Sequence, residues 1–222
     1  MAGSAARTLA FADVERALAA PLPGYAAQAR MATRPRLVLT PGEHSVEPTQ
    51  SAVLLALYER DGALRLPLTL RSNRVAHHRG QISFPGGVRE AQDPDLWATA
   101  LREAQEEIGL APASVRRLGS LSPLLIPASC FLVHPFVASL AAPPLFRPAS
   151  DEVAEIIELP LALLLDPAAR QEEQRLLHDQ WTRVPFYRYS EHAIWGATAM
   201  MLSEFEVLLT AALAEGGAGA LL

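Results

Sequence analysis

The hydrophobic positions of this chain fall into short runs that are separated by turn-forming residues. Compact apolar runs predict strands, and they occur at 35–39, 51–58, 64–71, 81–84, 152–159 and in two or three pieces within 116–140. Asp61-Gly62, between two of these runs, predicts a tight hairpin. Helical spacing predicts a short amphipathic helix at 7–19 and a longer helix near 193–214, followed by a frayed tail at 215–220.

The strongest helix signal extends from about Pro94 to Ile108. Asp93 is a suitable N-cap, Pro94 suits the first helical position, and Gly109 stands where a C-terminal cap belongs. Strands and helices mixed along one chain favour an α+β sandwich. We predict a single domain over residues 1–222, with a core at about 35–160 and helical extensions at both ends.

The composition narrows the classes of function. A formal net charge of -5 argues against a nucleic-acid binder, which would carry a basic stripe. All 19 basic residues are arginines, a bias that codon usage explains, so their number is not evidence for a site. The single cysteine, Cys130, excludes an internal disulfide and a cysteine metal cluster.

Two apolar segments raise the question of a membrane or a secretion signal. Charged residues interrupt the apolar run at 9–20, which therefore does not read as a secretory signal. Five prolines divide the uncharged stretch 118–146 into pieces too short to span a bilayer as a helix. We expect a cytoplasmic protein that is not associated with membranes.

The helix at 94–108 carries the candidate chemistry. At 100° per residue, Glu103, Glu106 and Glu107 share one face, opposite the apolar face of Trp97, Leu101, Ala104 and Ile108. Two carboxylates about 4 Å apart repel by roughly 4 kcal/mol at an effective dielectric near 20, and the only adjacent base is Arg102. A hard cation such as Mg²⁺ or Mn²⁺ fits this imbalance; an exposed acidic helix without a metal is the alternative.

The sequence around this helix resembles a known family. Residues 87–110 read GVREAQDPDLWATALREAQEEIGL and resemble the Nudix box, G-x5-E-x7-R-E-U-x-E-E-x-G-U, where U is aliphatic. The chain departs from the box in having Asp93 in place of the glutamate, eight residues rather than seven before Arg102, and the small Ala104 at an aliphatic position.

These departures are similar to those of the coenzyme A pyrophosphatase branch of the Nudix family. That branch also has an upstream signature, L-L-T-x-R-[S/A]-x3-R-x3-G-x3-F-P-G-G, which residues 68–72 and 80–87 match at the same spacing. Pro67 replaces its first leucine, and Ala76 stands at its second arginine, whose role Arg74 or Arg79 could take. The two motifs span residues 67–110, about a fifth of the chain.

The resemblance implies a Nudix α/β/α sandwich with a mixed sheet and a Mg²⁺-dependent (or Mn²⁺-dependent) hydrolase. Its substrate would be coenzyme A or an acyl-coenzyme A, cleaved at the diphosphate to 3′,5′-adenosine diphosphate and 4′-phosphopantetheine or its acyl form. The metal ligands implied are Glu103, Glu106, Glu107 and the Gly86 carbonyl. Glu103 is alternatively the base for the attacking water, and Arg102 orients it.

Residues outside the box complete the expected site. Among three acidic residues near a turn, Asp151, Glu152 and Glu155, we select Glu152 because it opens a predicted strand. The expected substrate-binding residues lie on the loop upstream of the box: Arg71, His77, His78 and Arg79.

Three alternatives remain open at this stage. One is a Nudix hydrolase of ADP-ribose, dinucleotides or nucleoside triphosphates. Another is a non-catalytic Nudix domain, although the metal-binding half of the box lacks no glutamate. The third is an acidic-helix interaction protein. The sequence is equally compatible with a monomer and a homodimer.

Overall fold

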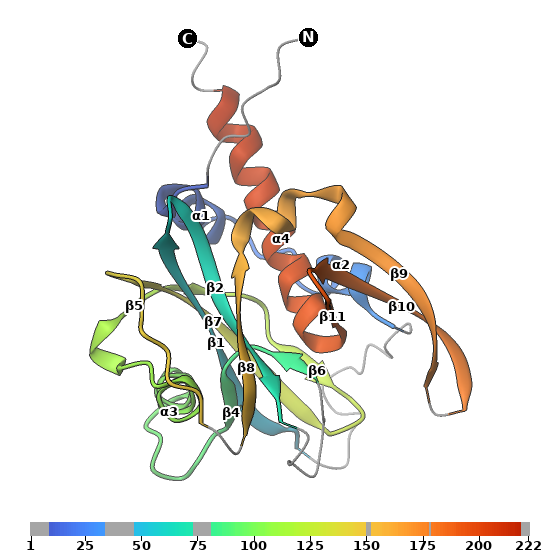
Figure 1. Ribbon diagram of the computed structural model, residues 1–222, viewed down its shortest axis with the longest axis horizontal. Helices are drawn as coiled ribbons and strands as arrows, with labels where there is room; N and C mark the ends of the chain where they lie inside the picture. The colour runs from blue at the N-terminus through green and yellow to red at the C-terminus, as the bar shows by residue number, and fades with distance from the viewer. Residues whose placement is uncertain (1–8, 34–46, 73–80, 150–151, 178, 219–222) are drawn as a thin grey trace.

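Two β-sheets and four α-helices make up the part of the chain that the computed structural model describes, residues 9–33, 47–72, 81–149, 152–177 and 179–218. The helices are α1 (Phe11–Ala19), α2 (Tyr25–Gln28), α3 (Leu96–Ile108) and α4 (Gly196–Ala218). The strands of the larger sheet are β1 (Thr49–Arg60), β2 (Ala63–Arg71), β3 (Ile82–Ser83), β4 (Gly86–Val88), β5 (Val115–Ser120), β6 (Leu124–Ile126), β7 (Phe131–Leu140) and β8 (Val153–Pro160). The smaller sheet contains β9 (Arg170–Leu177), β10 (Gln180–Tyr189) and β11 (His192–Trp195) (Figure 1).

The larger sheet is mixed. Its main path has the order β3-β2-β1-β7-β5, while β4 pairs with β1, β6 with β7, and β8 with β2. β1 and β7 run parallel, from Thr49 opposite Phe131 to Leu57 opposite Ser139, and the other pairs are antiparallel. A parallel pair requires a long crossover, and α3 lies within that crossover. The predicted α+β fold with a mixed sheet is confirmed.

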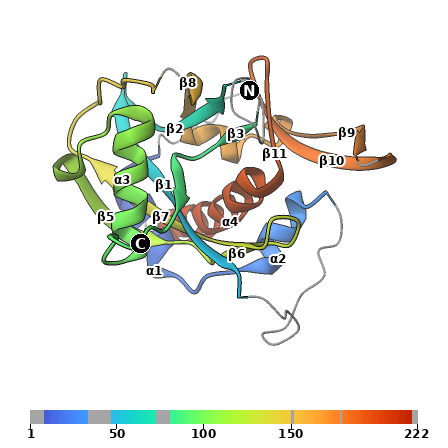
Figure 2. The same cartoon turned by 90° about the horizontal axis from the view of Figure 1, so that it is seen from below.

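Side-chain alternation along β1 gives the sheet two apolar faces. Leu54 and Tyr58 pack with the cluster beneath α3, whereas Leu55 and Leu57 belong to the cluster that includes α4, because successive residues of a strand point to opposite faces. Figure 2 shows α3 and α4 on opposite sides of β1 and β7. The sheet therefore holds α3 firmly enough to position chemistry on it.

α4 is a core helix in this fold. Its segment Gly196–Gly216 is long and apolar enough to cross a bilayer by length and composition, and 61% of the most apolar window is buried within the structure. It contacts α1, α2 and the short 3₁₀ helices Ala29–Met31 and Leu161–Leu165. These contacts account for its hydrophobicity.

Most predicted elements are present, with some shifts. The Asp61-Gly62 hairpin joins β1 and β2 as predicted, and 116–140 contains three strands. The C-terminal helix begins at Gly196 because residues 192–195 form β11, and it continues through Ala218, so the frayed tail predicted from 215 is wrong up to that residue. The sequence analysis missed the β9–β10 hairpin. The strand predicted at 35–39 lies outside the described residues.

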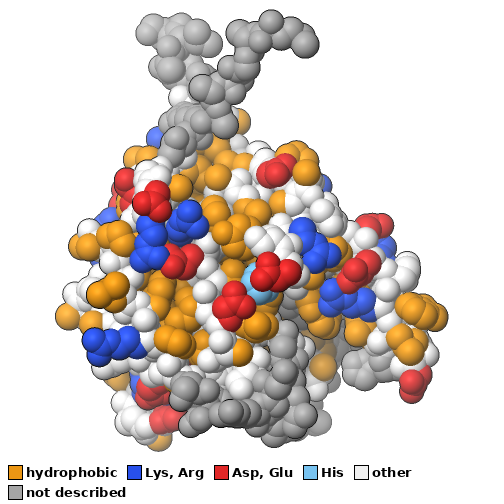
Figure 3. Space-filling model, viewed as in Figure 1, with side chains coloured by type: hydrophobic (Ala, Val, Ile, Leu, Met, Phe, Trp, Pro, Cys, Tyr) orange, Lys and Arg blue, Asp and Glu red, His pale blue; other side chains and the backbone are white. Residues whose placement is uncertain are grey.

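Charges of both signs intermingle on one face of the molecule. Figure 3 shows acidic and basic side chains side by side on the face drawn in Figure 1. On this face, the described residues form no continuous basic stripe.

Candidate active site

The loop that precedes α3 lies unusually close to its neighbours at two glycines. β4 pairs antiparallel with β1, with Val53 opposite Gly86 and Ala52 opposite Gly87. A Cβ atom on Gly86 would collide with the Ala52 carbonyl and the Val53 backbone, and one on Gly87 would collide with the Glu103 carboxylate. The absence of side chains therefore allows β4 to lie against both β1 and the glutamate face of α3.

α3 begins two residues later than predicted. The N-cap is Asp95, whose side chain accepts a hydrogen bond from the Ala98 amide at 2.8 Å. Asp93, predicted as the N-cap, is buried and bonded to Arg102 instead, so that assignment is wrong. The predicted C-cap is confirmed, because Gly109 has the left-handed φ of 71° that favours glycine.

The three glutamates of α3 differ in exposure. The side chain of Glu107 is 6% exposed and that of Glu106 58% exposed, with Glu103 between them. The expectation that all three lie away from the packing surface is wrong for Glu107, because β4 covers it. The Gly86 amide donates a hydrogen bond to the Glu107 carboxylate at 3.3 Å.

Burial and like charge make the ionised state of these carboxylates unfavourable. Burial raises the pKa of Glu107 to about 7, and the charges of Glu103 and Glu152 add to this rise, although the Gly86 amide and Arg71 oppose it. Burial also raises the pKa of Glu103, against the effect of Arg102. The site therefore holds more negative charge than its own cations neutralise.

A divalent cation fits this donor set. Among the described residues, no group of three carboxylate, imidazole or thiol side chains is already arranged as a complete set of metal ligands. The donors present are carboxylate oxygens in excess of nearby positive charge, which are the ligands that Mg²⁺ takes. A bound cation would stabilise the ionised carboxylates against the burial and the like-charge repulsion that raise both pKa values.

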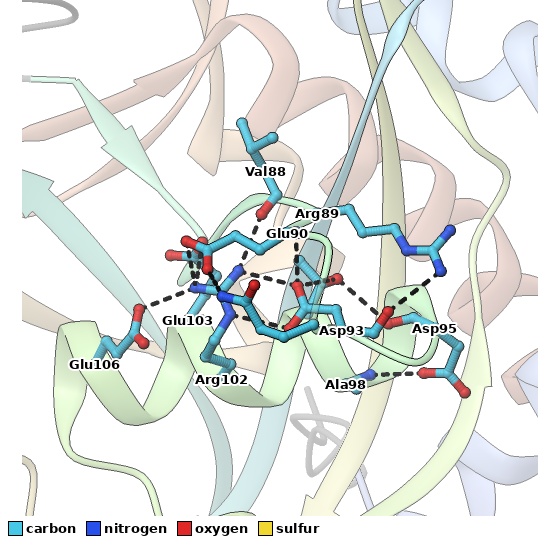
Figure 4. A network of polar contacts seen from close by, with 11 residues as sticks. Val88, Arg89, Glu90, Asp93, Asp95, Ala98, Arg102, Glu103 and Glu106 are labelled. Atoms are coloured by element: carbon cyan, nitrogen blue, oxygen red, sulfur yellow. Dashed lines mark hydrogen bonds and ion pairs between the residues drawn. The ribbon is translucent and has the colours of Figure 1, made fainter.

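Arg102 lies at the centre of this cluster rather than at its edge (Figure 4). Its Nε and Nη2 donate to the Asp93 carboxylate at 3.1 Å, Nη1 donates to Glu103 and Glu106 at 3.0 Å, and Nη2 also donates to the Val88 carbonyl at 3.0 Å. These contacts use all five N–H groups of the guanidinium. The hydrogen bonds from Arg102 lower the pKa of Asp93 to about 2.

Asp93 is the anchor of this network, a role that the sequence analysis did not assign. It also accepts hydrogen bonds from the Thr99 hydroxyl and the Glu90 amide, both at 2.9 Å. An ionised, nearly buried carboxylate with these donors fixes the guanidinium, which in turn fixes Glu103. The only sequence signal was that Asp93 takes the place of the motif's glutamate.

Replacing Arg102 by lysine should impair catalysis although the charge is kept. Lysine has three donors and no planar fork, so it cannot bind Asp93 in two places and still reach Glu103. We expect kcat to fall about tenfold or more and the free energy of unfolding to fall by about 1–2 kcal/mol. The measurements are steady-state kinetics and thermal unfolding.

The matched control for this change is Arg116→Lys, which alters an exposed arginine paired with Glu15 on the surface. It should leave both quantities near their original values. An unchanged kcat in Arg102→Lys would show that the five-donor network does not position Glu103.

Two residues from outside the Nudix box reach the cluster. Arg71, at the end of β2, places Nη1 3.9 Å from a Glu107 oxygen. Glu152, just before β8, is close enough for its charge to raise the pKa values of Glu103 and Glu107. β2 and β8 are paired, and the Ser72 amide bonds the Glu152 carbonyl at 2.8 Å, which brings the two residues together.

The other predicted site residues are placed elsewhere or are not described. Glu155, not selected, bonds His192 at 3.2 Å. Asp151, His77, His78 and Arg79 lie outside the described residues. Within the described part of the chain, the buried Nε of Arg71 has no hydrogen-bond partner.

Comparisons with known proteins show the family of this chain. Residues 48–180 match the family model of the NUDIX domain. A Nudix hydrolase of uncharacterized activity, NudL of Pectobacterium atrosepticum, is 36% identical over 186 residues, which cover 80% of this chain and 92% of NudL. The human mitochondrial coenzyme A diphosphatase NUDT8 is 38% identical over 169 residues, covering 74% of this chain and 70% of NUDT8.

A solved structure shows the same fold. The Nudix hydrolase RenU of M. smegmatis aligns with a TM-score of 0.51 at 16% sequence identity, covering 75% of this chain and 87% of RenU. The chain belongs to the Nudix family. It is a Nudix hydrolase, an enzyme class that acts on pyrophosphate bonds of small molecules and generally uses a divalent metal ion.

Proposed function

We propose that this enzyme hydrolyses the diphosphate linkage of coenzyme A or its thioesters with Mg²⁺ or Mn²⁺. The products are 3′,5′-adenosine diphosphate and 4′-phosphopantetheine, or its acyl form. The observation that carries the proposal is an arginine beside the carboxylate cluster: Arg71, whose side chain is 30% exposed and whose Nη1 lies 3.9 Å from a Glu107 oxygen. Arg71 belongs to the upstream motif that resembles the coenzyme A branch, and NUDT8 is named for the same activity.

The metal would be held by Glu103, Glu106, Glu107 and the Gly86 carbonyl. When bound, a divalent ion supplies charge neutralisation for the diphosphate and lowers the pKa of a coordinated water. The excess negative charge described above supports this assignment.

The remaining steps belong to side chains of this chain. Arg102 holds the Glu103 carboxylate in place through the bond at 3.0 Å. Glu152 accepts the proton of the attacking water, or Glu103 does where it is not a metal ligand, because both carboxylates lie at the cluster. Arg71 donates to the phosphate oxygens, which stabilises the charge that develops as the phosphate ester leaves.

A product assay tests the proposal. The purified protein is incubated with coenzyme A, 3′-dephospho-coenzyme A, ADP-ribose, a diadenosine polyphosphate and ATP, each with Mg²⁺ and with EDTA. We expect the highest kcat/KM for coenzyme A and loss of turnover in EDTA. A higher kcat/KM for ADP-ribose, a dinucleotide or ATP would assign the enzyme to another Nudix activity, and no Mg²⁺-dependent turnover of any substrate would indicate a non-catalytic domain.

A further inference from the structure

One long strand edge of the smaller sheet has no partner. The order of that sheet is β11-β10-β9, so β9 is paired on one side only, through the eight positions Arg170–Leu177. Within the described part of the chain no strand pairs with its outer edge, and Figure 1 shows β9 at the rim of the molecule. An exposed edge of this length presents a row of free backbone N–H and C=O groups that another strand can bind.

The order of charged and neutral residues at the start of β9 is the same in both chain directions. Its first six residues are Arg-Gln-Glu-Glu-Gln-Arg, from Arg170 to Arg175. Two identical strands related by a twofold axis run antiparallel. Pairing about the centre of this palindrome would set like charges opposite each other, so a stable register has to be offset from it. The axis is then perpendicular to the sheet and passes between the two strands, midway between one residue and its own copy.

The position of that axis decides whether the charges attract or repel. Centring on residue 172 or 173 sets glutamate against glutamate, and centring on 175 sets arginine against arginine. Centring on Gln174 pairs residues 171–177 with their copies and places Glu173 opposite Arg175 of the second copy, twice. Opposite charges directly across an antiparallel pair stabilise it, and like charges destabilise it.

We propose that two copies of this chain associate through their β9 edges, antiparallel and centred on Gln174, so that two three-stranded sheets join into one of six strands. Arg175 forms an ion pair with Glu173 of its own chain, and its guanidinium also lies 5.1 Å from the centre of the Trp195 ring. In the dimer, each Glu173 lies next to the Arg175 of its own chain and opposite the Arg175 of the second copy, so the four side chains form a network of alternating charges. Charged residues usually protect an edge strand from pairing; here they disfavour the registers centred on 172, 173 and 175. Centring on Gln171 would also set opposite charges together, Arg170 against Glu172, but it pairs only residues 170–172 of β9, whereas centring on Gln174 pairs 171–177.

An apolar pair on the opposite face of the hairpin supports association. Leu176 lies opposite Trp181 in the β9–β10 register, and these residues are 57% and 73% exposed. In the proposed register, Leu176 also lies opposite Glu172 of the second copy, whose methylene groups cover part of it. The dimer therefore removes apolar surface from water as well as pairing charges.

Charge reversal tests both the edge and the register. By sedimentation velocity over a concentration series, we expect the wild type to approach twice its mass of 24.0 kDa. Glu173→Arg and Arg175→Glu should each weaken the dimer at least tenfold, because each sets two pairs of like charges across the axis. The double variant Glu173→Arg/Arg175→Glu recreates opposite pairs and should restore the wild-type dissociation constant within a few-fold.

The matched control is Glu59→Arg, which reverses an exposed charge on β1 and should leave the dimer unchanged. Circular dichroism establishes that each variant is folded, and Glu173→Arg alone suffices as the single reversal should Arg175→Glu not fold. A wild type that stays at 24.0 kDa throughout overturns the proposal. So does a dimer that withstands a single reversal, or a double variant that stays as weak as the single ones.

Discussion

Glu107→Gln should lower kcat by about a thousandfold or more while the metal-free protein becomes more stable. The loss of activity follows from removing a carboxylate that is proposed to hold the metal, whose stabilisation of transition-state charge amounts to several kcal/mol. The gain in stability follows from burial, which raises the pKa of Glu107 from 4.5 to about 7. The neutral amide avoids that penalty, and its oxygen can still accept the Gly86 hydrogen bond.

The sign of the pH dependence follows from the direction of this shift. Because the folded state holds its proton more tightly than the unfolded state, the wild type loses stability as pH rises from about 4.5 through about 7. In EDTA, Glu107→Gln should be more stable than wild type by on the order of 3 kcal/mol at pH 8, and this difference should almost vanish near pH 4.5. Urea unfolding at several pH values measures it.

Glu106→Gln is the matched control on the same helix. Its side chain is 58% exposed, so the metal-free stability of this variant should stay close to that of wild type. If Glu107→Gln keeps near-normal turnover, Glu107 is not a metal ligand. If the metal-free Glu107→Gln protein is less stable than wild type, burial of the ionised Glu107 carboxylate does not destabilise the folded state.

Glu204→Ala should cause a large loss of stability. Glu204 is fully buried, and its carboxylate accepts hydrogen bonds from the Gly24 amide at 3.1 Å, the Gln28 side chain at 2.9 Å and the Ser122 amide at 3.2 Å. These donors come from the N-terminal segment and the loop after β5. Alanine would leave the half-buried Gly24 and Ser122 amides without this acceptor and Gln28 Nε2 with only its bond to the Ser122 carbonyl, at roughly 3 kcal/mol.

Thermal unfolding should show this as a fall in Tm of about 10 °C. Thr210→Ala is the control, because its hydroxyl bonds only a carbonyl of its own helix at an exposed position, and Tm should then change by about 2 °C at most. Turnover by the folded Glu204→Ala protein should remain, since none of its partners belongs to the carboxylate cluster. A change below about 1 kcal/mol would mean that water replaces the carboxylate as acceptor.

The sequence predicts the site well where spacing alone determines geometry. A helix brings residues three and four apart onto one face, so the grouping of Glu103 with Glu106 follows directly. Spacing along the helix does not show that a strand from elsewhere in the chain covers Glu107. β4 consists of two glycines and a valine, which predict a turn, and its position over Glu107 depends on pairing with β1.

The remaining differences also have tertiary causes. Asp93 and Asp95 are both good N-caps by residue type. Asp95 caps the helix because the Asp93 carboxylate is buried and accepts a hydrogen bond from Arg102. β9 lacks apolar alternation because most of its side chains are exposed on both faces, so it could not be recognised from a hydrophobic pattern. Glu204 looks like any helical glutamate until its three distant donors are known.

The two glycines of β4 constrain how this enzyme can vary. In a saturation-mutagenesis screen, positions 86 and 87 should both reject larger residues, but for different reasons. A side chain at position 86 meets fixed backbone, whereas one at 87 meets the movable end of Glu103. Glu103→Asp should therefore relieve the collision in Gly87→Ala but not the one in Gly86→Ala. Of the two glycines, only position 87 could then change during evolution and alter the shape of the active site.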